Sequence, residues 1–318
     1  MNALRPSLLV ALILIVVDAE SQNGKIIEQS LYHLHDSLLT RMEKIIPNIY
    51  LINRDVNFYH IIYLSDGLKV KGYLAVPKKE GKYPCIIYNR GGNREFGKIT
   101  EASFVRGIGE LSSMGYIVAG SQYRGNDGGE GNEEFGGKDV NDVLNLIPLF
   151  SQINAADTSR MGMFGWSRGG MMTYIALSKT KKMKAAVVGS GLADLIKTLE
   201  TRPEFDSLVF AQLIPSYTNN KINALKERSA VYFADKINKT TPILVLQGTA
   251  DWRVPSDQVL DLVKKFYDVN QPVRFILYEG GQHSLAEFRN DCISQIENWF
   301  NTYLRDRKPW PNLEPHGD

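Results

Sequence analysis

The fold of this chain is decided by residues 161–170, which read MGMFGWSRGG. The segment contains the pattern Gly-x-Ser-x-Gly, with an apolar run before it that predicts a strand and an amphipathic run after it that predicts a helix. The chain must turn sharply from the strand into the helix, which crowds the backbone. Gly165 and Gly169 relieve this crowding because they lack a Cβ atom. Ser167 is then expected to be a nucleophile with strained dihedrals, and the amide of Arg168 is placed to donate to an oxyanion. A glycine-rich turn without chemistry is the alternative, which the flanking strand and helix disfavour.

Short apolar runs alternate with helical stretches through the rest of the chain. Such runs are typical of strands buried on both faces, as in a parallel sheet that helices cover. Two earlier strands, near residues 57–64 and 68–76, are joined by Ser65-Asp66-Gly67 and predict an antiparallel hairpin. Together with the nucleophile motif, this order predicts an α/β-hydrolase fold, with a mostly parallel eight-stranded sheet and helices on both faces. The six later strands are expected at residues 85–88, 116–120, 161–165, 185–189, 243–247 and 273–278.

Three further segments flank or interrupt the catalytic domain, which we place at residues 57–304. Residues 20–56 are expected to be helical, because apolar residues from Ile26 to Met42 recur at helical spacing and predict one helix over residues 24–46. Residues 195–235 are rich in helix formers and aromatic residues, and are expected to lie over the site as a small helical cap. Residues 305–318 hold three prolines and predict a loose tail.

The first residues of the chain have the features of a signal peptide. Arg5 precedes an unbroken apolar run at residues 8–17, and short side chains follow at Val17 and Ala19. We therefore expect residues 1–19 to be removed, which makes the protein secreted or periplasmic. A retained membrane anchor is the alternative, but a spanning helix needs about 20 apolar residues, so we expect no stable membrane span.

The charge and the cysteines argue against several kinds of site. The formal net charge is +2, with 23% charged residues, and no basic run indicates a nucleic-acid partner. Cys85 falls in a predicted strand and Cys292 in a predicted helix, where we expect buried free thiols, although an exported protein could join them. Neither cysteine lies in a zinc motif, so no metal site is predicted.

A nucleophilic serine needs a general base and an acid that orients the base, and in the α/β-hydrolase fold these residues follow in the chain order Ser, Asp or Glu, His. Three of the five histidines precede the serine and His316 lies in the predicted tail, which leaves His283, in a glycine-containing loop after the last strand. Asp251 and Asp194 both follow predicted strands. We prefer Asp251, because it lies in a glycine-containing turn at a strand tip, whereas Asp194 fits a helix cap. His283 is then expected to take the serine proton, and Asp251 to hold the imidazole in the right tautomer.

At these residues the sequence resembles the catalytic domain of the prolyl oligopeptidase family of serine peptidases. The resemblance implies a serine hydrolase that acts on peptides or acyl esters, with no metal and no organic cofactor. Family peptidases carry a β-propeller before the catalytic domain, and the residues ahead of Pro84 are too few to form one. The matching stretches are residues 72–77 (GYLAVP), 123–125 (YRG), 165–170 (GWSRGG), 228–229 (RS) and 248–255 (GTADWRVP), together with His283.

A second departure from the family concerns the oxyanion site. Several relatives have a tyrosine directly before the Gly-Gly that follows the third strand, where this chain has Arg90 before Gly91. The resemblance then implies a donor that is a backbone amide near Arg90 or Gly91, or the arginine itself. Trp166, Arg90 and Arg94 are the candidate substrate-binding residues, and an anionic group is the expected partner of the two arginines. A solvated loop or a structural ion pair is the alternative for both.

We expect a serine hydrolase that cleaves peptide or acyl ester bonds of a short peptide or small molecule through an acyl-enzyme. A carboxylesterase or acetyl esterase for acylated small molecules or sugars is the first alternative, because amide and ester hydrolysis use the same triad. A non-catalytic binding module on a hydrolase scaffold is the second, and the intact Ser, Asp and His argue against it. Nothing in the sequence indicates the oligomeric state.

Overall fold

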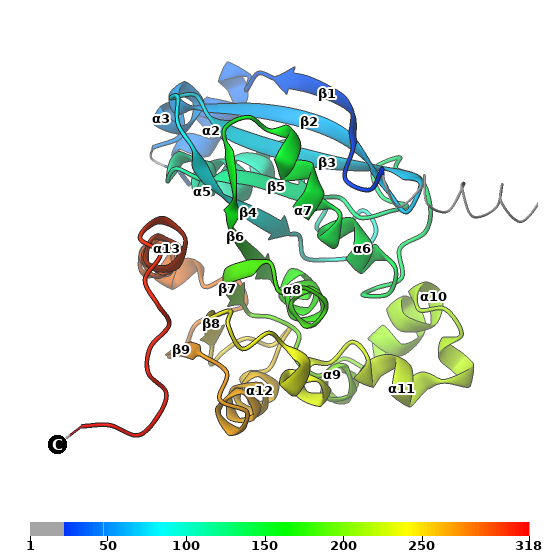
Figure 1. The fold of residues 1–318 in the computed structure, drawn as a ribbon. Coiled ribbons are helices and arrows are strands. Elements are labelled where there is room, and N and C mark those ends of the chain that lie inside the picture. Colours follow the sequence, from blue (N-terminus) through cyan, green and yellow to red (C-terminus); the bar gives the residue numbers. More distant parts are fainter. Residues whose placement is uncertain (1–21, 47, 318) are drawn as a thin grey trace, which may run out of the picture.

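The computed structural model describes residues 22–46 and 48–317, and one nine-stranded sheet runs through its centre (Figure 1). The strand order is β1-β2-β3-β5-β4-β6-β7-β8-β9. Strands β1, β2, β3 and β5 pair antiparallel, and all pairs from β5 to β9 are parallel. The sheet is the predicted α/β-hydrolase sheet with one strand more than expected. Its strands are β1 (Ile26–Tyr32), β2 (Val56–Ser65), β3 (Leu68–Pro77), β4 (Tyr83–Asn89), β5 (Ile117–Ser121), β6 (Ala156–Trp166), β7 (Met183–Gly189), β8 (Ile243–Gly248) and β9 (Val273–Tyr278).

Helices cover both faces of this sheet, as its apolar strands require. Alternate side chains of β4 point to opposite faces: Cys85 and Ile87 join one core, and Ile86 joins the other. The first core is covered by α6 (Asp139–Leu144), α7 (Leu146–Leu149), α8 (Arg168–Lys179) and α12 (Ser256–Asp268). The second is covered by α2 (Asp36–Glu43), α3 (Ile49–Asp55), α4 (Glu101–Ser103), the π-helix η1 (Phe104–Gly109), α5 (Glu110–Ser113) and α13 (Arg289–Phe300), which continues into η8 (Asn301–Arg305).

The prediction of one helix over residues 24–46 is wrong. Residues 26–32 form the edge strand β1, which pairs antiparallel with β2, and only residues 36–43 are helical. The spacing of apolar residues suggested a buried helical face, but Leu31 lies in the strand and is 49% exposed, so it belongs to no such face. Leu38 and Met42 do form the buried side of α2, so the helical period holds for the second half of the segment. The ninth strand of the sheet comes from this segment.

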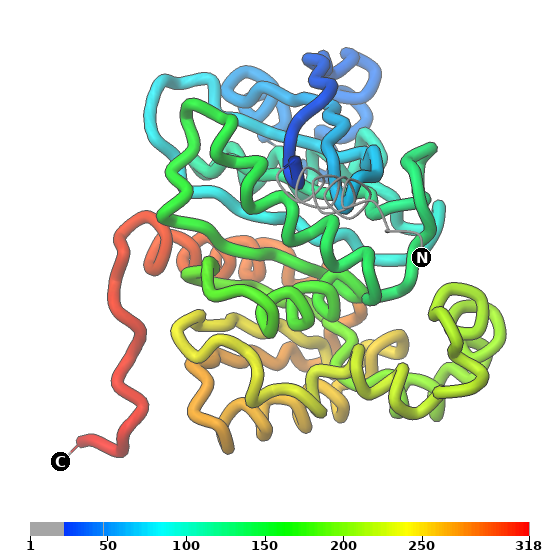
Figure 2. Tube along the Cα trace, turned by 45° about the vertical axis from the view of Figure 1, so that its right-hand side comes forward, coloured from blue at the N-terminus to red at the C-terminus, as the bar shows by residue number. Residues whose placement is uncertain are grey.

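The predicted insertion at residues 195–235 is helical and projects from one side of the body. Figure 1 and Figure 2 both show α10 and α11 (drawn in yellow-green) beyond the rest of the sheet and its helices. Its contact with the body includes Phe210, whose ring lies edge-on to Phe135 at 5.4 Å. The insertion contains α9 (Leu195–Thr201), η3 (Asp206–Phe210), α10 (Ala211–Leu213), η4 (Tyr217–Asn219), α11 (Lys221–Lys226) and η5 (Ala230–Tyr232).

The two ends of the chain differ in what the structure describes. Residues 306–317, where the sequence predicted a loose tail, contain no helix or strand, and their side chains are exposed. The predicted signal peptide, residues 1–19, lies outside the described residues. Within the described ranges, no helix is both long and apolar enough to cross a membrane.

Candidate active site

The nucleophile motif forms the predicted sharp turn between β6 and α8. Ser167 stands between the last residue of β6 and the first of α8, with φ 58° and ψ −125°. A positive φ is costly for a residue with a Cβ atom, so this strain is held by the structure around the turn. A Cβ atom on Gly165 would collide with the carbonyl of Gly169, and one on Gly169 would collide with the carbonyl of Asn89. Both glycines are therefore required by the packing of the turn, as the sequence predicted.

His283 and Asp251 meet at the carboxyl ends of two neighbouring strands. Nδ1 of His283 lies 2.8 Å from Oδ2 and 3.0 Å from Oδ1 of Asp251. The loops after β8 and β9 approach so closely that a Cβ atom on Gly248 would collide with the carbonyl of Gly281. This approach brings together two residues that are 32 positions apart in the sequence.

Asp251 is fixed as a carboxylate. Its Oδ1 accepts hydrogen bonds from the backbone amides of Arg253 (2.9 Å) and Val254 (3.0 Å), and its side chain is buried. Burial alone raises the pKa of the Asp251 carboxyl, but His283 and the two amides outweigh burial, so that the pKa lies below its ordinary value. The rival Asp194 instead caps α9, accepting hydrogen bonds from the amides of Ile196 and Lys197.

Ser167 and His283 border the same cavity, whose volume is about 410 Å³. No hydrogen bond joins the two side chains within the described part of the chain, and bonds of this kind often tighten only when substrate binds. Trp166 also borders the cavity, and its Nε1 donates to the carbonyl of His283 at 2.8 Å. The tryptophan therefore holds the histidine loop against the nucleophile turn.

Gly91 lies beside Ser167, where the sequence predicted an oxyanion donor. A Cβ atom placed on Gly91 would lie 3.4 Å from Cβ and 4.0 Å from Oγ of Ser167. The main chain at Gly91 thus passes close to the side chain of Ser167, as a backbone oxyanion donor requires.

Arg90 does not reach the cavity, which contradicts the prediction that its side chain binds substrate or donates to the oxyanion. The side chain is 1% exposed. Its Nε donates to the carbonyl of Gln122 (3.0 Å), and its two terminal nitrogens donate to the carbonyls of Gly91 and Arg94 (3.1 Å each). The sequence places the arginine at the position of the relatives' tyrosine, but its long side chain points into the protein and stabilises the loop by hydrogen bonds to loop carbonyls.

Arg94 does not line the cavity either. Its guanidinium donates to the carbonyl of Leu208 at 3.2 Å and to Oε1 of Gln212 at 2.7 Å, and so connects the loop at residues 90–94 to the insertion. The lining of the cavity contains no residue from 195–235, so the expected position of the insertion over the site does not hold for this cavity.

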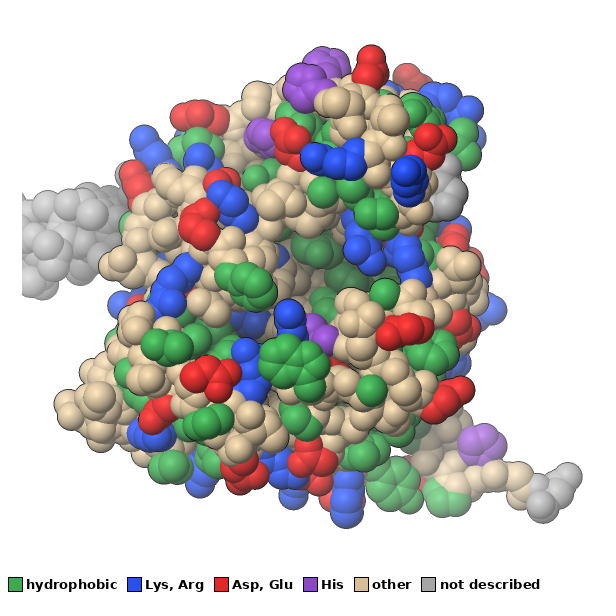
Figure 3. All heavy atoms as spheres, turned by 180° about the vertical axis from the view of Figure 1, so that it is seen from behind, with side chains coloured by type: hydrophobic (Ala, Val, Ile, Leu, Met, Phe, Trp, Pro, Cys, Tyr) green, Lys and Arg blue, Asp and Glu red, His purple; other side chains and the backbone are tan. Residues whose placement is uncertain are grey.

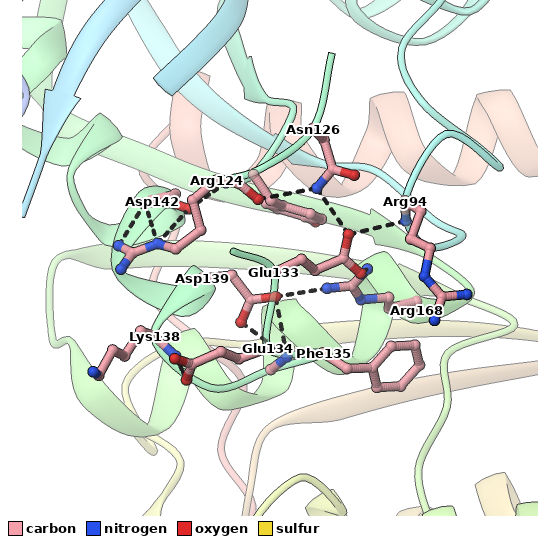
Figure 4. Close-up of polar contacts among 12 residues, drawn as sticks. Arg94, Arg124, Asn126, Glu133, Glu134, Phe135, Lys138, Asp139, Asp142 and Arg168 are labelled. Atoms are coloured by element: carbon pink, nitrogen blue, oxygen red, sulfur yellow. Dashed lines mark hydrogen bonds and ion pairs between the residues drawn. The ribbon is translucent and has the colours of Figure 1, made fainter. Parts of the chain in front are cut away.

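A buried network of charges lies behind the nucleophile turn, and sequence reasoning missed it (Figure 4). The guanidinium of Arg168 is ion-paired with Glu133 and with Asp139 (2.7 Å), and it also donates to the carbonyl of Gly92 at 2.9 Å. The other carboxylate oxygen of Glu133 accepts from the backbone amide of Arg94 at 2.9 Å. Glu133 therefore connects the first residue of α8 with the loop that carries Gly91.

This network is fully enclosed, and its carboxyl pKa values reflect that. Burial raises the pKa of both acids, but Arg168 and the neighbouring donors lower that of Glu133 below its ordinary value, while that of Asp139 stays raised. The sequence offered one signal, the acidic residues inside the glycine-rich loop 125–137. Buried arginines at positions 90 and 168 need such partners, but their burial was not predictable from the sequence.

The described residues hold no group of three or more His, Cys, Asp or Glu side chains arranged to bind a metal ion. Cys85 and Cys292 are free and buried, as predicted. Cys292 lies in the cavity wall, and burial is the main cause that raises its thiol pKa.

Comparison with known proteins agrees with this geometry. The family model described as the prolyl oligopeptidase family matches residues 103–307. The chain is 30% identical over 250 residues to the uncharacterized peptidase YtmA of Bacillus subtilis, covering 78% of this chain and 94% of that protein. It is 26% identical to the acylamino-acid-releasing enzyme of Arabidopsis thaliana, covering 72% of this chain but only 31% of that enzyme.

Solved structures share the fold. The chain superposes on the Pyrococcus horikoshii acylaminoacyl peptidase with a TM-score of 0.65 at 21% identity, over 85% of this chain and 45% of that one. A puromycin-hydrolyzing peptidase of Mycobacterium tuberculosis gives a TM-score of 0.63 at 24% identity, over 79% of this chain and 38% of that one. The chain thus spans less than half of these longer peptidases.

Proposed function

Because this chain belongs to the prolyl oligopeptidase family of serine peptidases, we propose that Ser167 is its nucleophile, His283 its general base and Asp251 the acid that orients the histidine. The observation that carries the proposal is the bond between His283 and Asp251 beside a strained serine at the same cavity. These are the three groups that acyl transfer by a serine hydrolase uses, and they follow one another in the chain order that is usual for this fold.

The reaction proceeds in two halves. His283 takes the proton of Ser167 while Oγ forms a bond to the substrate carbonyl carbon, and Asp251 stabilises the imidazolium that results. The tetrahedral adduct then breaks its bond to the leaving nitrogen or oxygen, to which His283 returns the proton. Water attacks the acyl-enzyme with His283 again as base, which releases a carboxylic acid and the free serine. The amide of Arg168 and an amide of the loop at Gly91 are the proposed oxyanion donors.

Short peptides, or small molecules that carry an amide or ester, are the proposed substrates. The names of the relatives favour a peptidase, and YtmA supports it most because this chain covers nearly all of that protein. A carboxylesterase or acetyl esterase is the second candidate, since the same triad serves both bonds. A panel of acyl-amino-acid amides, short peptides and aryl esters, compared by kcat/KM, decides between them. Activity on esters alone would contradict the peptidase assignment, and activity that persists in Ser167→Ala would contradict the nucleophile.

Export to the periplasm or the medium is a further part of the proposal, and it rests on the apolar run at residues 8–17. Mass spectrometry of the protein from its native host should find a mature chain that begins at Glu20. An intact N-terminus in the membrane fraction would indicate a retained anchor instead.

A further inference from the structure

The cavity beside Ser167 extends away from the insertion and into the second core. It runs from the nucleophile between the segment 103–114, which includes η1 and α5, and the segment 283–296, which leads into α13. Figure 3, seen from behind, shows this hollow with hydrophobic and basic side chains at its edge. Its volume of about 410 Å³ is within the range of ligand sites, about 300–1,000 Å³.

Apolar side chains form most of this cavity. Tyr88 from β4 and Phe164 from β6 stack at 5.5 Å between ring centroids, and both border the cavity. Gly107 allows η1 to pack against Tyr88, since a Cβ atom there would lie 2.8 Å from the tyrosine ring. Leu111, Met114, Ile293 and Ile296 complete the apolar wall. An occupant must therefore have an apolar body.

The cavity wall contains more arginine side chains than carboxylates to pair with them. Arg289 is paired with Glu110 at 2.7 Å. Arg106, one turn before Glu110 on the same helical segment, also borders the cavity and has no carboxylate within ion-pair distance among the described residues. The hydroxyl of Tyr88 likewise makes no hydrogen bond with any described residue. Two guanidinium groups of the wall, those of Arg106 and Arg253, therefore have no carboxylate partner among the described residues. Of these, Arg106 lies on the segment η1 that packs against Tyr88, and a guanidinium beside a free hydroxyl suits a carboxylate.

The cavity lies on the histidine side of the nucleophile. His283, Ser284 and Leu285 border it in sequence, and α13 follows directly. His283 must pass its proton to the departing atom, so the departing half of the substrate leaves on this side.

We propose that this cavity binds the departing half of the substrate, and that this half is a C-terminal residue with an apolar side chain whose carboxylate is bound by Arg106. The proposal rests on the proposed function and adds its specificity: the enzyme removes a C-terminal apolar residue from a short, N-blocked peptide. The products are the shortened acid and the free amino acid.

Pairs of blocked dipeptides that differ only at the C-terminus test the carboxylate. Benzyloxycarbonyl-Ala-Phe as the free acid should be cleaved with a kcat/KM at least about tenfold above that of its C-terminal amide, since hydrogen bonds to charged groups are worth that factor or more. In Arg106→Gln the acid-to-amide ratio should fall by about tenfold. The ratio is measured within one preparation, so partial misfolding of the variant cancels. Arg41→Gln, an exposed arginine on α2 that does not border the cavity, is the matched control.

The apolar body is tested by filling the cavity. Ile293→Trp should raise the KM of a substrate that ends in Phe more than the KM of one that ends in Ala. Leu260→Trp, on the exposed side of α12, should leave the ratio of these two KM values as in the wild type. An equal rate for acid and amide, or an equal loss of the ratio in Arg106→Gln and Arg41→Gln, would overturn the carboxylate site. If the KM of Ile293→Trp depended on the residue before the cleaved bond rather than on the C-terminal residue, the cavity would not bind the departing half of the substrate.

Failure of this inference can be separated from failure of the proposed function. Wild-type protein that reacts with a fluorophosphonate at Ser167 but shows no preference for the free acid refutes the cavity proposal alone. Protein that does not react at all refutes the triad on which the proposal rests.

Discussion

Glu133 offers a test of how the nucleophile turn is held in place. The substitution Glu133→Gln keeps the shape of the side chain and removes its charge. Arg168 then loses one of its two carboxylate partners inside the protein, while it keeps Asp139 at 2.7 Å and the carbonyl of Gly92 at 2.9 Å. Removing one partner of a buried ion pair costs about 3–5 kcal/mol. Because Asp139 remains, we expect a loss of about 3 kcal/mol, at the lower end of that range.

Two assays measure this effect. Each kcal/mol shifts Tm by about 2–4 °C in domains of 150–250 residues, so the thermal midpoint should fall by about 6–12 °C. Glu133 touches no proposed reacting group and acts as a positioning residue. In the variant, the hydrogen bond from the amide of Arg94, which holds the loop at Gly91, is weakened. We therefore expect kcat to fall by about ten- to a hundredfold, which is less than the 10²–10³-fold loss that removal of a whole oxyanion donor causes. KM on a small aryl ester should change little.

Glu134→Gln is the matched control for this substitution. The neighbouring glutamate is half-buried, and its side chain accepts a hydrogen bond from the local amide of Lys138. Its replacement should change the free energy of unfolding by no more than about 0.5 kcal/mol. If Glu133→Gln matched Glu134→Gln in both Tm and kcat, the network would not position the turn and the reasoning would be refuted.

Three further expectations concern the triad. Asp251→Ala should lower kcat by about 10⁴-fold. Asp194→Ala should lower the free energy of unfolding by about 1 kcal/mol, because a helix cap is lost, and should change kcat little. If steady-state assays gave the reverse pattern, the roles of the two aspartates would be exchanged. His283→Ala should lower kcat by about 10⁶-fold, because Ser167 then has no general base, and an unchanged kcat would exclude that role. Because the pKa of Asp251 is lower in the folded protein than its ordinary 3.8, the stability that it contributes is complete at neutral pH and is lost as the pH falls below about 4. Urea titrations between pH 6 and pH 3 should therefore show a smaller loss in Asp251→Asn than in the wild type, and equal slopes would contradict the assigned shift.

The sequence predicted the features that depend on local chemistry. The glycines around Ser167 and the loop glycines near Asp251 and His283 are needed by close backbone contacts, and such requirements appear directly as residue types at fixed spacing. The alternation of apolar strands with helices likewise predicted the sheet and its helical cover. These patterns are short in sequence, so no tertiary information was needed to find them.

The errors came from features that tertiary contacts decide. The apolar spacing from Ile26 to Leu31 fits a helix, but backbone hydrogen bonds to β2 make the segment an edge strand. The position of Arg90 suggested a side chain that faces the substrate, whereas hydrogen bonds to the carbonyl of Gln122 and to two carbonyls of its own loop hold it inside. The cavity is formed where η1 and α13, far apart in the sequence, leave space over Tyr88 and Phe164, and no local pattern reports such a space.

The measurement that tests the central claim most directly is the position of a covalent adduct. The wild-type protein is treated with a fluorophosphonate, digested and analysed by tandem mass spectrometry. We expect one adduct, on Ser167, and none in the Ser167→Ala variant under the same conditions. An adduct on another residue, or labelling that persists in Ser167→Ala, would contradict the assignment of Ser167 as the nucleophile.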